Sequence, residues 1–589
     1  MNNKGRILNH VFWNVIISMI LVEFSNVGCG FVDGVIISRF LGTTAMAAQG
    51  MAYPYFSLLG IVSGMLATGM QTLCTTYIGE GKKKELNSVF SLTCLATALT
   101  SVVITLLILF PARQISEALV SAKDNVELLG EVQRYLRGVA IGTPALLFVA
   151  ILAPIVNMDG SKMLARISVT ALFVADVIGD LLVVVLKGGI FGMGLATSIS
   201  NYIAAAILLT HFFGKNCTVR FVLSDLNVPE LLDILKIGLP KATKRLANTL
   251  RPLCLNGLVL KYGATVGMSA MSVRNNVNNL VDILGSGLVA ATLLMVSILY
   301  GEKYRNGIRH ITKQALRYNF LIVGSLTLLL LVTAPQIAGF YVDGDPQTKA
   351  MAVTAIRFMA LNLPLNTFAE IYVNFLQGTK RHNGVHILNF CSRFFCVVVC
   401  AFIMGHFWGI NGIWAAFPVG SLLLIVTIAV VCSVKKRNGC SLYEAMFCLP
   451  DDFGVPDENT MECSITTKPE ANDLSIRAVD FCTDHGIDAR RANLMGLCIE
   501  EMAGNIVEHG FCMDKRKHSI DIRVIISGDR LTLRLRDDCP LFDVKERGEQ
   551  WRMNPEDPAA CIGIRLTMRI SQDMVYISTL GTNNLIVTI

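Results

Sequence analysis

The sequence has few charged residues for its length. Of its 589 residues only 16% are charged and 53% are hydrophobic, and the mean hydropathy is +0.54. Soluble globular chains are about 25% charged. The apolar excess lies in residues 11–434, whereas residues 435–589 read as ordinary soluble sequence. We therefore expect a lipid bilayer as the main partner, and the net charge of +7 gives no reason to expect nucleic acid.

Three chemical signatures are missing. The 17 cysteines include no Cys-x-x-Cys pair and no Cys/His ligand spacing, which favours buried free thiols over a metal site. No Gly-x-x-x-x-Gly-Lys-Ser/Thr loop occurs, so the membrane body is not expected to be an ATP-powered pump. No small-residue cleavage site follows the first apolar run, which is therefore expected to be an uncleaved helix.

Long apolar stretches recur about twelve times. A bilayer core of about 30 Å needs roughly 20 apolar residues per helix. The expected spans lie near residues 14–38, 46–76, 89–111, 132–157, 164–186, 190–213, 235–260, 266–300, 316–334, 351–376, 384–404 and 409–433. Lys and Arg gather in alternate loops, which places both termini in the cytoplasm by the positive-inside rule.

Two halves of this apolar region resemble each other. Gly79-Glu80-Gly81-Lys82 follows one long span, and Gly301-Glu302-Lys303 follows another half the region later. An even number of spans per half makes the copies parallel, as in transporter repeats. The pattern predicts two parallel six-helix lobes at residues 1–214 and 215–436, a linker at 437–460 and a soluble domain at 461–589.

Several motifs in this region occur in a recognisable order. They are Gly30-Phe-Val-Asp33-Gly with the following loop to Gly50, Gly64-Met-Leu-Ala-Thr-Gly69, Gly192-Met-Gly-Leu-Ala-Thr197, Leu363-Pro-Leu365 and Leu376-Gln-Gly378. Residues 8–436 thereby resemble the MATE family of multidrug and toxin extrusion antiporters. The resemblance implies a plasma-membrane carrier that exports small organic molecules against H⁺ or Na⁺.

Three carboxylates are expected inside the first lobe. Asp33 lies within the first span, and Asp176 and Asp180 lie four residues apart on the fifth, hence on one helix face. Thr197 and Ser198 on the sixth span are candidate neighbours. Three close carboxylates cannot all be ionised, so at least one is expected to hold a proton. The MATE resemblance implies an ion-coupling role for Asp33 and Asp180, with Asp176 where the family usually has Asn. A purely structural role remains the alternative.

The second lobe has a mixed polar set. Glu370 lies on the tenth span where the family places a functional carboxylate, and we assign it to ion coupling. The eighth span carries a polar stripe in which Arg274, Asn278 and Asp282 are the candidate residues of the substrate cavity. A cavity that contained Arg251 and Arg274 would prefer anionic or zwitterionic cargo. Pairing of Arg274 with Asp282 or Glu370 as a structural tie is the alternative.

The soluble segment is predicted to be an α/β sandwich. Apolar residues alternate over 520–526 and 531–535 around the turn Ser527-Gly528-Asp529-Arg530, which indicates a β-hairpin. Residues 575–579 and 585–589 form a second predicted hairpin around Gly581, and helices are expected before residue 510 and after Gly563.

Motifs in this segment resemble those of GHKL-type ATP-binding domains, with anti-sigma-factor serine kinases the nearest. They are Glu500-Glu501-Met-Ala-Gly-Asn505, Asp537-Asp-Cys-Pro-Leu-Phe-Asp543 and Gly563-Ile-Arg-Leu566. The resemblance implies that Asn505 ligates the Mg²⁺ of Mg-ATP and that Glu501 is a base or water orienter. It implies that Asp537 holds the adenine amino group and that Gly563 borders the nucleotide.

Three functions remain open on sequence alone. The first is a MATE-like exporter whose cytoplasmic ATP-binding domain regulates it or signals its state. The second is a membrane-tethered anti-sigma-type serine kinase or switch that senses through the transporter body and binds a cytoplasmic partner protein. The third is a lipid-precursor flippase. The placed carboxylates Asp33, Asp180 and Glu370 favour the first.

Overall fold

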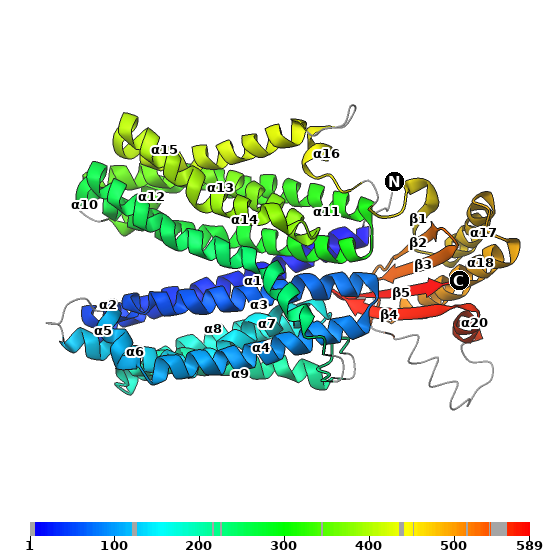
Figure 1. The fold of residues 1–589 in the computed structure, drawn as a ribbon, viewed down its shortest axis with the longest axis horizontal. Helices are drawn as coiled ribbons and strands as arrows, with labels where there is room; N and C mark the ends of the chain where they lie inside the picture. Colours follow the sequence, from blue (N-terminus) through cyan, green and yellow to red (C-terminus); the bar gives the residue numbers. More distant parts are fainter. Residues whose placement is uncertain are drawn as a thin grey trace.

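The protein consists of a helical body with a mixed α/β domain at one end (Figure 1). The computed structural model describes residues 6–119, 126–214, 217–223, 226–342, 346–434, 441–450, 453–513, 516–540, 542 and 562–589. Parts of the predicted linker, and Leu541 and Asp543 of the second ATP-binding motif, lie outside these ranges.

The helical body forms two lobes that lie side by side (Figure 1). The N-lobe comprises α1 (Arg6–Ile36), α2 (Thr43–Met51), α3 (Tyr53–Glu80), α4 (Lys83–Leu109), α5 (Ala112–Leu119), α6 (Val126–Ile141), α7 (Thr143–Met158), α8 (Lys162–Val185) and α9 (Gly189–Leu209). The C-lobe comprises α10 (Pro229–Gly301), α11 (Arg305–Tyr318), α12 (Gly324–Tyr341), α13 (Pro346–Gly378), α14 (His382–Phe390) and α15 (Cys396–Val434). Short π or 3₁₀ turns extend several of these helices: η1 (Ile37–Leu41), η2 (Thr210–Phe213), η3 (Asn319–Val323) and η4 (Cys391–Phe395).

Among the described residues, eight helical segments are long and apolar enough to cross a bilayer, or nine if α6 and α7 form one span. Those two helices meet at a bend of 47° where one straight span was expected. Pro144 lies in the first turn of α7 and has no N–H to continue the α6 ladder, which accounts for the bend.

Two of these segments are long helices in which the chain turns back, at Ala264 and Gly409, where φ is positive. A Cβ on Gly267 would lie 3.2 Å from the carbonyl oxygen of Val259, although eight residues of straight helix span about 12 Å. The count of twelve spans stays a prediction.

The two lobes touch most closely at the end that carries the α/β domain, which we call the domain end. Four glycines of α3 and α10 make this contact: Gly69, Gly79, Gly238 and Gly301. A Cβ on any of them would overlap a carbonyl oxygen of the opposite helix, Ile234, Ile298, Met65 and Thr76 respectively. We call these four residues the glycine seam. Only glycine permits backbones to approach this closely, as in other membrane helix pairs.

Away from the domain end, the two lobes contact each other through side chains and no longer through backbone atoms. The Lys241 stem and the Arg245 guanidinium of α10 lie against Gly64 and Gly60 of α3. Further along, the Ser57 and Thr249 hydroxyls are 3.5 Å apart. The lobes are therefore closed at the domain end and more loosely joined beyond it.

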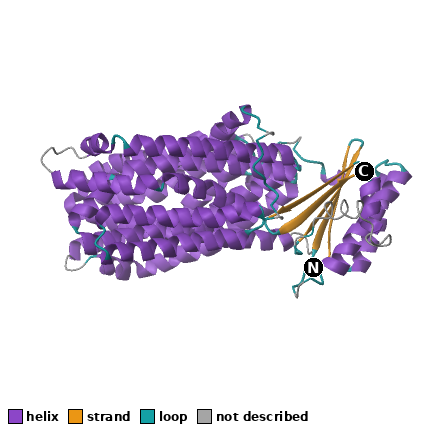
Figure 2. Ribbon diagram, turned by 90° about the horizontal axis from the view of Figure 1, so that it is seen from below, coloured by secondary structure: helices purple, strands orange, loops and turns teal. Residues whose placement is uncertain are grey.

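The α/β domain is a five-stranded antiparallel sheet with helices on one face (Figure 2). Its elements are η5 (Asp457–Asn459), β1 (Thr460–Ile465), α17 (Lys468–Asp484), α18 (Ala489–Asn505), η6 (Ile506–Gly510), β2 (Ile520–Ser527), β3 (Arg530–Asp537), α20 (Ile562–Ile570), β4 (Asp573–Thr579) and β5 (Thr582–Thr588), and α16 (Leu442–Met446) precedes them. The strand order is β1-β2-β3-β5-β4. Both predicted hairpins are present, and β1 is an additional strand that pairs with β2.

The alternating apolar residues of β2 and β3 point toward the helical layer. Ile522, Val524, Leu533 and Leu535 are nearly fully buried against α17 and α18 in one core. The residues between them point the other way, toward the two lobes.

The glycine seam gives a first testable prediction. Gly238→Ala adds a Cβ where the Met65 carbonyl lies, so the lobes must separate locally; overpacking of this kind costs about 1–3 kcal/mol. We expect a lower thermal unfolding midpoint for the purified protein in detergent. Gly257→Ala is the control, because nothing lies within 4 Å of a Cβ there. Equal midpoints for the two variants would contradict the close contact.

Candidate functional sites

The three N-lobe carboxylates predicted from the sequence lie together. Asp33 comes from α1 and Asp176 and Asp180 from α8, and one oxygen of each lies within 4.8 Å of the others. Their exposed fractions are 7%, 1% and 0%. The Ser200 hydroxyl of α9 donates to Asp176 at 3.1 Å.

This carboxylate cluster is short of donors. Asp33 Oδ1, Asp176 Oδ2 and both oxygens of Asp180 are buried and have no hydrogen-bond partner within the described part of the chain. Adjacent buried carboxylates repel one another unless a proton or a metal cation lies between them. Carboxylates in this arrangement suit a proton or a small cation. Ser198, a predicted neighbour, instead donates to the Gly138 and Gly194 carbonyls.

The C-lobe carboxylate Glu370 lies on α13 between two cations. Lys244 of α10 donates to it at 3.0 Å, and Arg393 of η4 forms a second ion pair with it. Glu370 is therefore a member of a basic cluster, an arrangement that differs from the acidic N-lobe site. The sequence pattern did not reveal this, because its two partners come from distant helices.

The predicted cavity residues lie on the part of α10 that follows the turn at Ala264. Arg274 is 5% exposed, donates to the Asn275 side chain at 2.8 Å and lies 3.8 Å from the centre of the Phe417 ring. Asp282 accepts from Ser286 at 3.5 Å, and Asn278 is half-buried four residues before it.

In the α/β domain, the first and third ATP-binding motifs meet. A Cβ on Gly563, at the start of α20, would overlap the Glu501 carboxylate of α18, so the two motifs are in direct contact. Asn505 is the last residue of α18, before the π turn that contains His509. Carboxylate and amide oxygens suit Mg²⁺, and helix N-termini such as that of α20 suit phosphate.

Asp537 lies at the end of β3 beside this pair of helices. Its Oδ1 accepts from the Cys539 amide at 3.0 Å and from the Asn583 side chain of β5 at 2.8 Å. Burial raises the pKa of Asp537 to about 6, so it is an acceptor at neutral pH. Asn583 was not singled out from the sequence, although it lies within the closing Gly581–Asn584 segment. Its role follows from the β3–β5 register.

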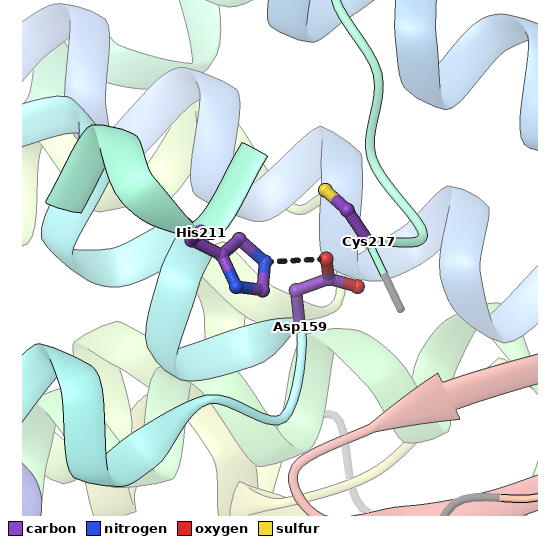
Figure 3. Close-up of side chains that lie close together, drawn as sticks. All are labelled: Asp159, His211 and Cys217. Carbon is purple, nitrogen blue, oxygen red and sulfur yellow. Dashed lines mark hydrogen bonds and ion pairs between the residues drawn. The ribbon is translucent and has the colours of Figure 1, made fainter. Parts of the chain in front are cut away.

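A further polar cluster joins three segments at the domain end (Figure 3). Asp159 accepts from the His211 ring at 2.8 Å and from the Thr218 amide at 2.9 Å. The thiol of Cys217 lies beside them and donates to the Val219 carbonyl at 2.8 Å. Burial, and then the Asp159 carboxylate, raise the pKa of this thiol to about 12. The cluster is thus a hydrogen-bonded tie between the α7–α8 loop, the end of α9 and the segment between the lobes.

The face of the sheet opposite its helices rests on both lobes. From β3, Arg536 forms an ion pair with Glu302 of the C-lobe, and Arg534 donates to the Gly79 carbonyl of the N-lobe at 3.2 Å. Arg523 of β2 lies over the Tyr304 ring at 4.1 Å, with its guanidinium 3.9 Å from Glu302. Burial lowers the pKa of Arg534 to about 10, which leaves it cationic at neutral pH.

The turn between β4 and β5 makes a further contact with the N-lobe. The Thr579 hydroxyl and the Leu580 amide donate to the Met158 carbonyl at 3.0 and 2.9 Å. Leu580 is 3% exposed and packs into the core of the helical body. The sheet thus contacts the loops that contain the two repeat motifs, after Gly79 in the N-lobe and after Gly301 in the C-lobe, which we call the repeat-related loops. It also contacts the α7–α8 loop.

The paired lobes, the buried carboxylate cluster and the appended sheet together describe a membrane transporter with a fused nucleotide-binding-type domain. Residues 18–182 and 240–403 match the MatE family model, and residues 469–589 match that of the histidine kinase-like ATPase domain. The chain belongs to the MatE family and carries a fused ATPase-type domain.

Relatives of known sequence or structure agree with this. Multidrug export protein MepA of Staphylococcus saprophyticus is 22% identical over 404 residues, which cover 68% of this chain and 88% of that one. An outward-facing multidrug resistance MATE family transporter of the MOP superfamily has a TM-score of 0.67 at 20% identity, covering 72% of this chain and 96% of its own. A Pyrococcus furiosus MOP superfamily transporter, described as having a binding pocket of reverse polarity, gives 0.67 at 20% identity, covering 74% and 100%.

The nucleotide site gives a second prediction. The full-length protein in detergent should bind Mg-ATP, and Asn505→Ala should weaken binding at least ~10-fold, or about 1.4 kcal/mol, because the expected Mg²⁺ ligand is lost. Binding is measured by equilibrium dialysis of labelled ATP with and without Mg²⁺. Asn493→Ala, exposed on the same helix, is the control. Unchanged Mg-ATP binding in the Asn505 variant would refute its assignment.

Proposed function

We propose that the protein is an H⁺-driven antiporter that exports small organic molecules across the plasma membrane, with both termini cytoplasmic. Its C-terminal domain binds Mg-ATP and controls opening at the domain end, which faces the cytoplasm. The named function of the MepA relative and the MatE membership support the export of small organic molecules. The single observation that carries the coupling is the donor-poor cluster of Asp33, Asp176 and Asp180.

Proton coupling follows from the electrostatics of that cluster. Charges inside a bilayer are costly, and three carboxylates within contact distance multiply the cost. A bound proton removes one charge and permits hydrogen bonding between the carboxyl groups. Since α1 and α8 each contribute, protonation changes the attraction between the helices and hence the balance between lobe arrangements.

This coupling is tested with proteoliposomes under a pH gradient. A panel of fluorescent probes of both charge signs, ethidium and carboxyfluorescein, covers the unknown cargo. We expect gradient-driven movement of at least one probe in the wild type and its loss in Asp33→Asn, which cannot exchange a proton. The exposed Asp473→Asn of α17 is the control. Full activity of Asp33→Asn, or movement supported by a Na⁺ gradient alone, would rule out proton coupling through this cluster.

Control by the C-terminal domain follows from where the sheet is docked. Arg534 and Arg536 are two residues apart on one strand and hold the N-lobe and the C-lobe respectively. Two residues of strand span about 7 Å, so both contacts persist only while the lobes stay together at this end. The docked domain therefore opposes opening toward the cytoplasm.

Two neighbouring residues of β5 connect the contact between sheet and lobes with the expected nucleotide site. Asn583 and Asn584 are neighbours on β5, paired with Asp537 and Arg536 of β3. Asn583 donates to Asp537 on the helical side, while Asn584 accepts from Arg536 at 2.7 Å on the lobe side. A nucleotide that engaged Asp537 would thus act on a strand that also positions the Glu302 contact. We therefore favour regulation over the anti-sigma-type kinase switch and the flippase.

Removal of the Glu302 charge tests this control. Glu302→Gln leaves Arg536 and Arg523 without their carboxylate, and loss of a charged hydrogen bond costs about 1.5–3 kcal/mol. We expect faster hydrogen exchange in the Met158–Lys162 and Gly301–Tyr304 loops and a higher initial transport rate.

The matched control is Glu80→Gln in the repeat-related loop of the N-lobe, where Glu80 pairs with Lys82 of the same loop at 2.7 Å. The reversed pair Glu302→Arg with Arg536→Glu should restore part of the protection. Unchanged exchange in Glu302→Gln would show that the sheet does not hold the lobes.

A further inference from the structure

Within its helices the C-lobe holds more partly or fully buried cations than anions. Five partly or fully buried cations lie on α10 and η4, namely Lys244, Arg245, Arg251, Arg274 and Arg393, and the exposed Lys241 lies beside Lys244. The acids that face them are Asp282, Glu370 and, from α1, Glu23. We propose that this basic cluster binds the cargo and that the cargo is an organic anion or zwitterion. This inference rests on the proposed transport function and assigns it a substrate class.

The ion pairs leave part of the positive charge of the cluster without a carboxylate partner. Glu370 is already shared by Lys244 and Arg393. Asp282 is the carboxylate within electrostatic range of Arg251, Arg274 and Arg393 alike. The Nε atoms of Arg245 and Arg393 are buried without a hydrogen-bond partner among the residues that the structure describes.

Such an excess is unfavourable without an anion. A charged side chain within the bilayer costs several kcal/mol unless it faces a partner or a water-filled cavity. A buried guanidinium is stabilised mainly by a carboxylate, sulfonate or phosphate that it can contact through two N–H groups. Three carboxylates cannot neutralise five partly or fully buried cations, so an incoming anion gains more here than a cation would.

Two of the basic side chains of the cluster lie at the boundary between the lobes. The Lys241 stem and the Arg245 guanidinium contact Gly64 and Gly60 of the N-lobe, so they occupy the boundary between the lobes, beyond the glycine seam. This is the looser part of the interface. A molecule bound there would contact both lobes and would be released when their arrangement changes.

One wall of the cluster suits an aromatic anion. Arg274 and Arg251 lie 3.8 and 5.9 Å from the centre of the Phe417 ring. Arg274 donates to the Asn275 side-chain oxygen, which leaves the Asn275 amide N–H groups as further donors. An aromatic ring stacked on this wall would place an attached acidic group against guanidinium and amide N–H groups.

Charge-matched probes in proteoliposomes test the inference. Under a pH gradient, carboxyfluorescein should be transported and ethidium should not, or only weakly. Arg251→Gln and Arg274→Gln should each raise the KM for carboxyfluorescein at least ~10-fold, since each removes a charged contact worth about 1.4 kcal/mol or more. Arg357→Gln, exposed on α13, is the control and should leave the KM unchanged.

The conservative variant Arg251→Lys separates binding from folding, because it keeps the charge and should retain part of the affinity. The thermal midpoint of each variant reports whether it folds. Transport of ethidium without carboxyfluorescein would overturn the anionic class and leave the transport function standing. Movement of neither probe would count against the proposed transport function and the inference together. An unchanged KM in a folded Arg251→Gln protein would exclude this cluster as the cargo site.

Discussion

The backbone contact between α3 and α10 is the constraint on which the rest of the structure depends. Carbonyl oxygens of one helix lie where side chains of the other would begin, so the four glycines of the seam allow no residue with a Cβ. This contact brings the loops after Gly79 and Gly301 side by side. Those loops are the repeat-related segments of the two lobes, and only their proximity allows one strand, β3, to contact both.

The charges of the two lobes are opposite and separate. The N-lobe buries three carboxylates with few donors, whereas the C-lobe holds five partly or fully buried cations near Glu370, Asp282 and, from α1 of the N-lobe, Glu23. A transporter that exchanges a proton for an organic anion needs such a division, because each ligand is then attracted to the site that repels the other. A single mixed cavity would neutralise its own charges internally and bind neither ion well.

Much of the architecture could be predicted from the sequence, and the reasons are local. Apolar length revealed the helices, the four-residue spacing of Asp176 and Asp180 placed them on one face, and alternation in 520–535 predicted the β2–β3 hairpin. The partners of Glu370 could not be predicted, since Lys244 and Arg393 reach it from other helices. Alternation showed which residues of β3 face the helical core. It carried no information about what covers Arg534 and Arg536, because arginine occurs both on faces exposed to solvent and on faces that contact another protein surface.

The docking of the sheet suggests how, in the proposed function, an ATPase-type domain regulates a carrier that an ion gradient drives. An antiparallel sheet presents alternate residues to its two faces, so neighbouring residues such as Asn583 and Asn584 belong to different environments without any long-range path. One holds Asp537 at the nucleotide side, and the other holds Arg536 against Glu302. In the proposed function, nucleotide binding needs to shift only the docking equilibrium, for which about 1–2 kcal/mol suffices, and the ion gradient supplies the energy of transport.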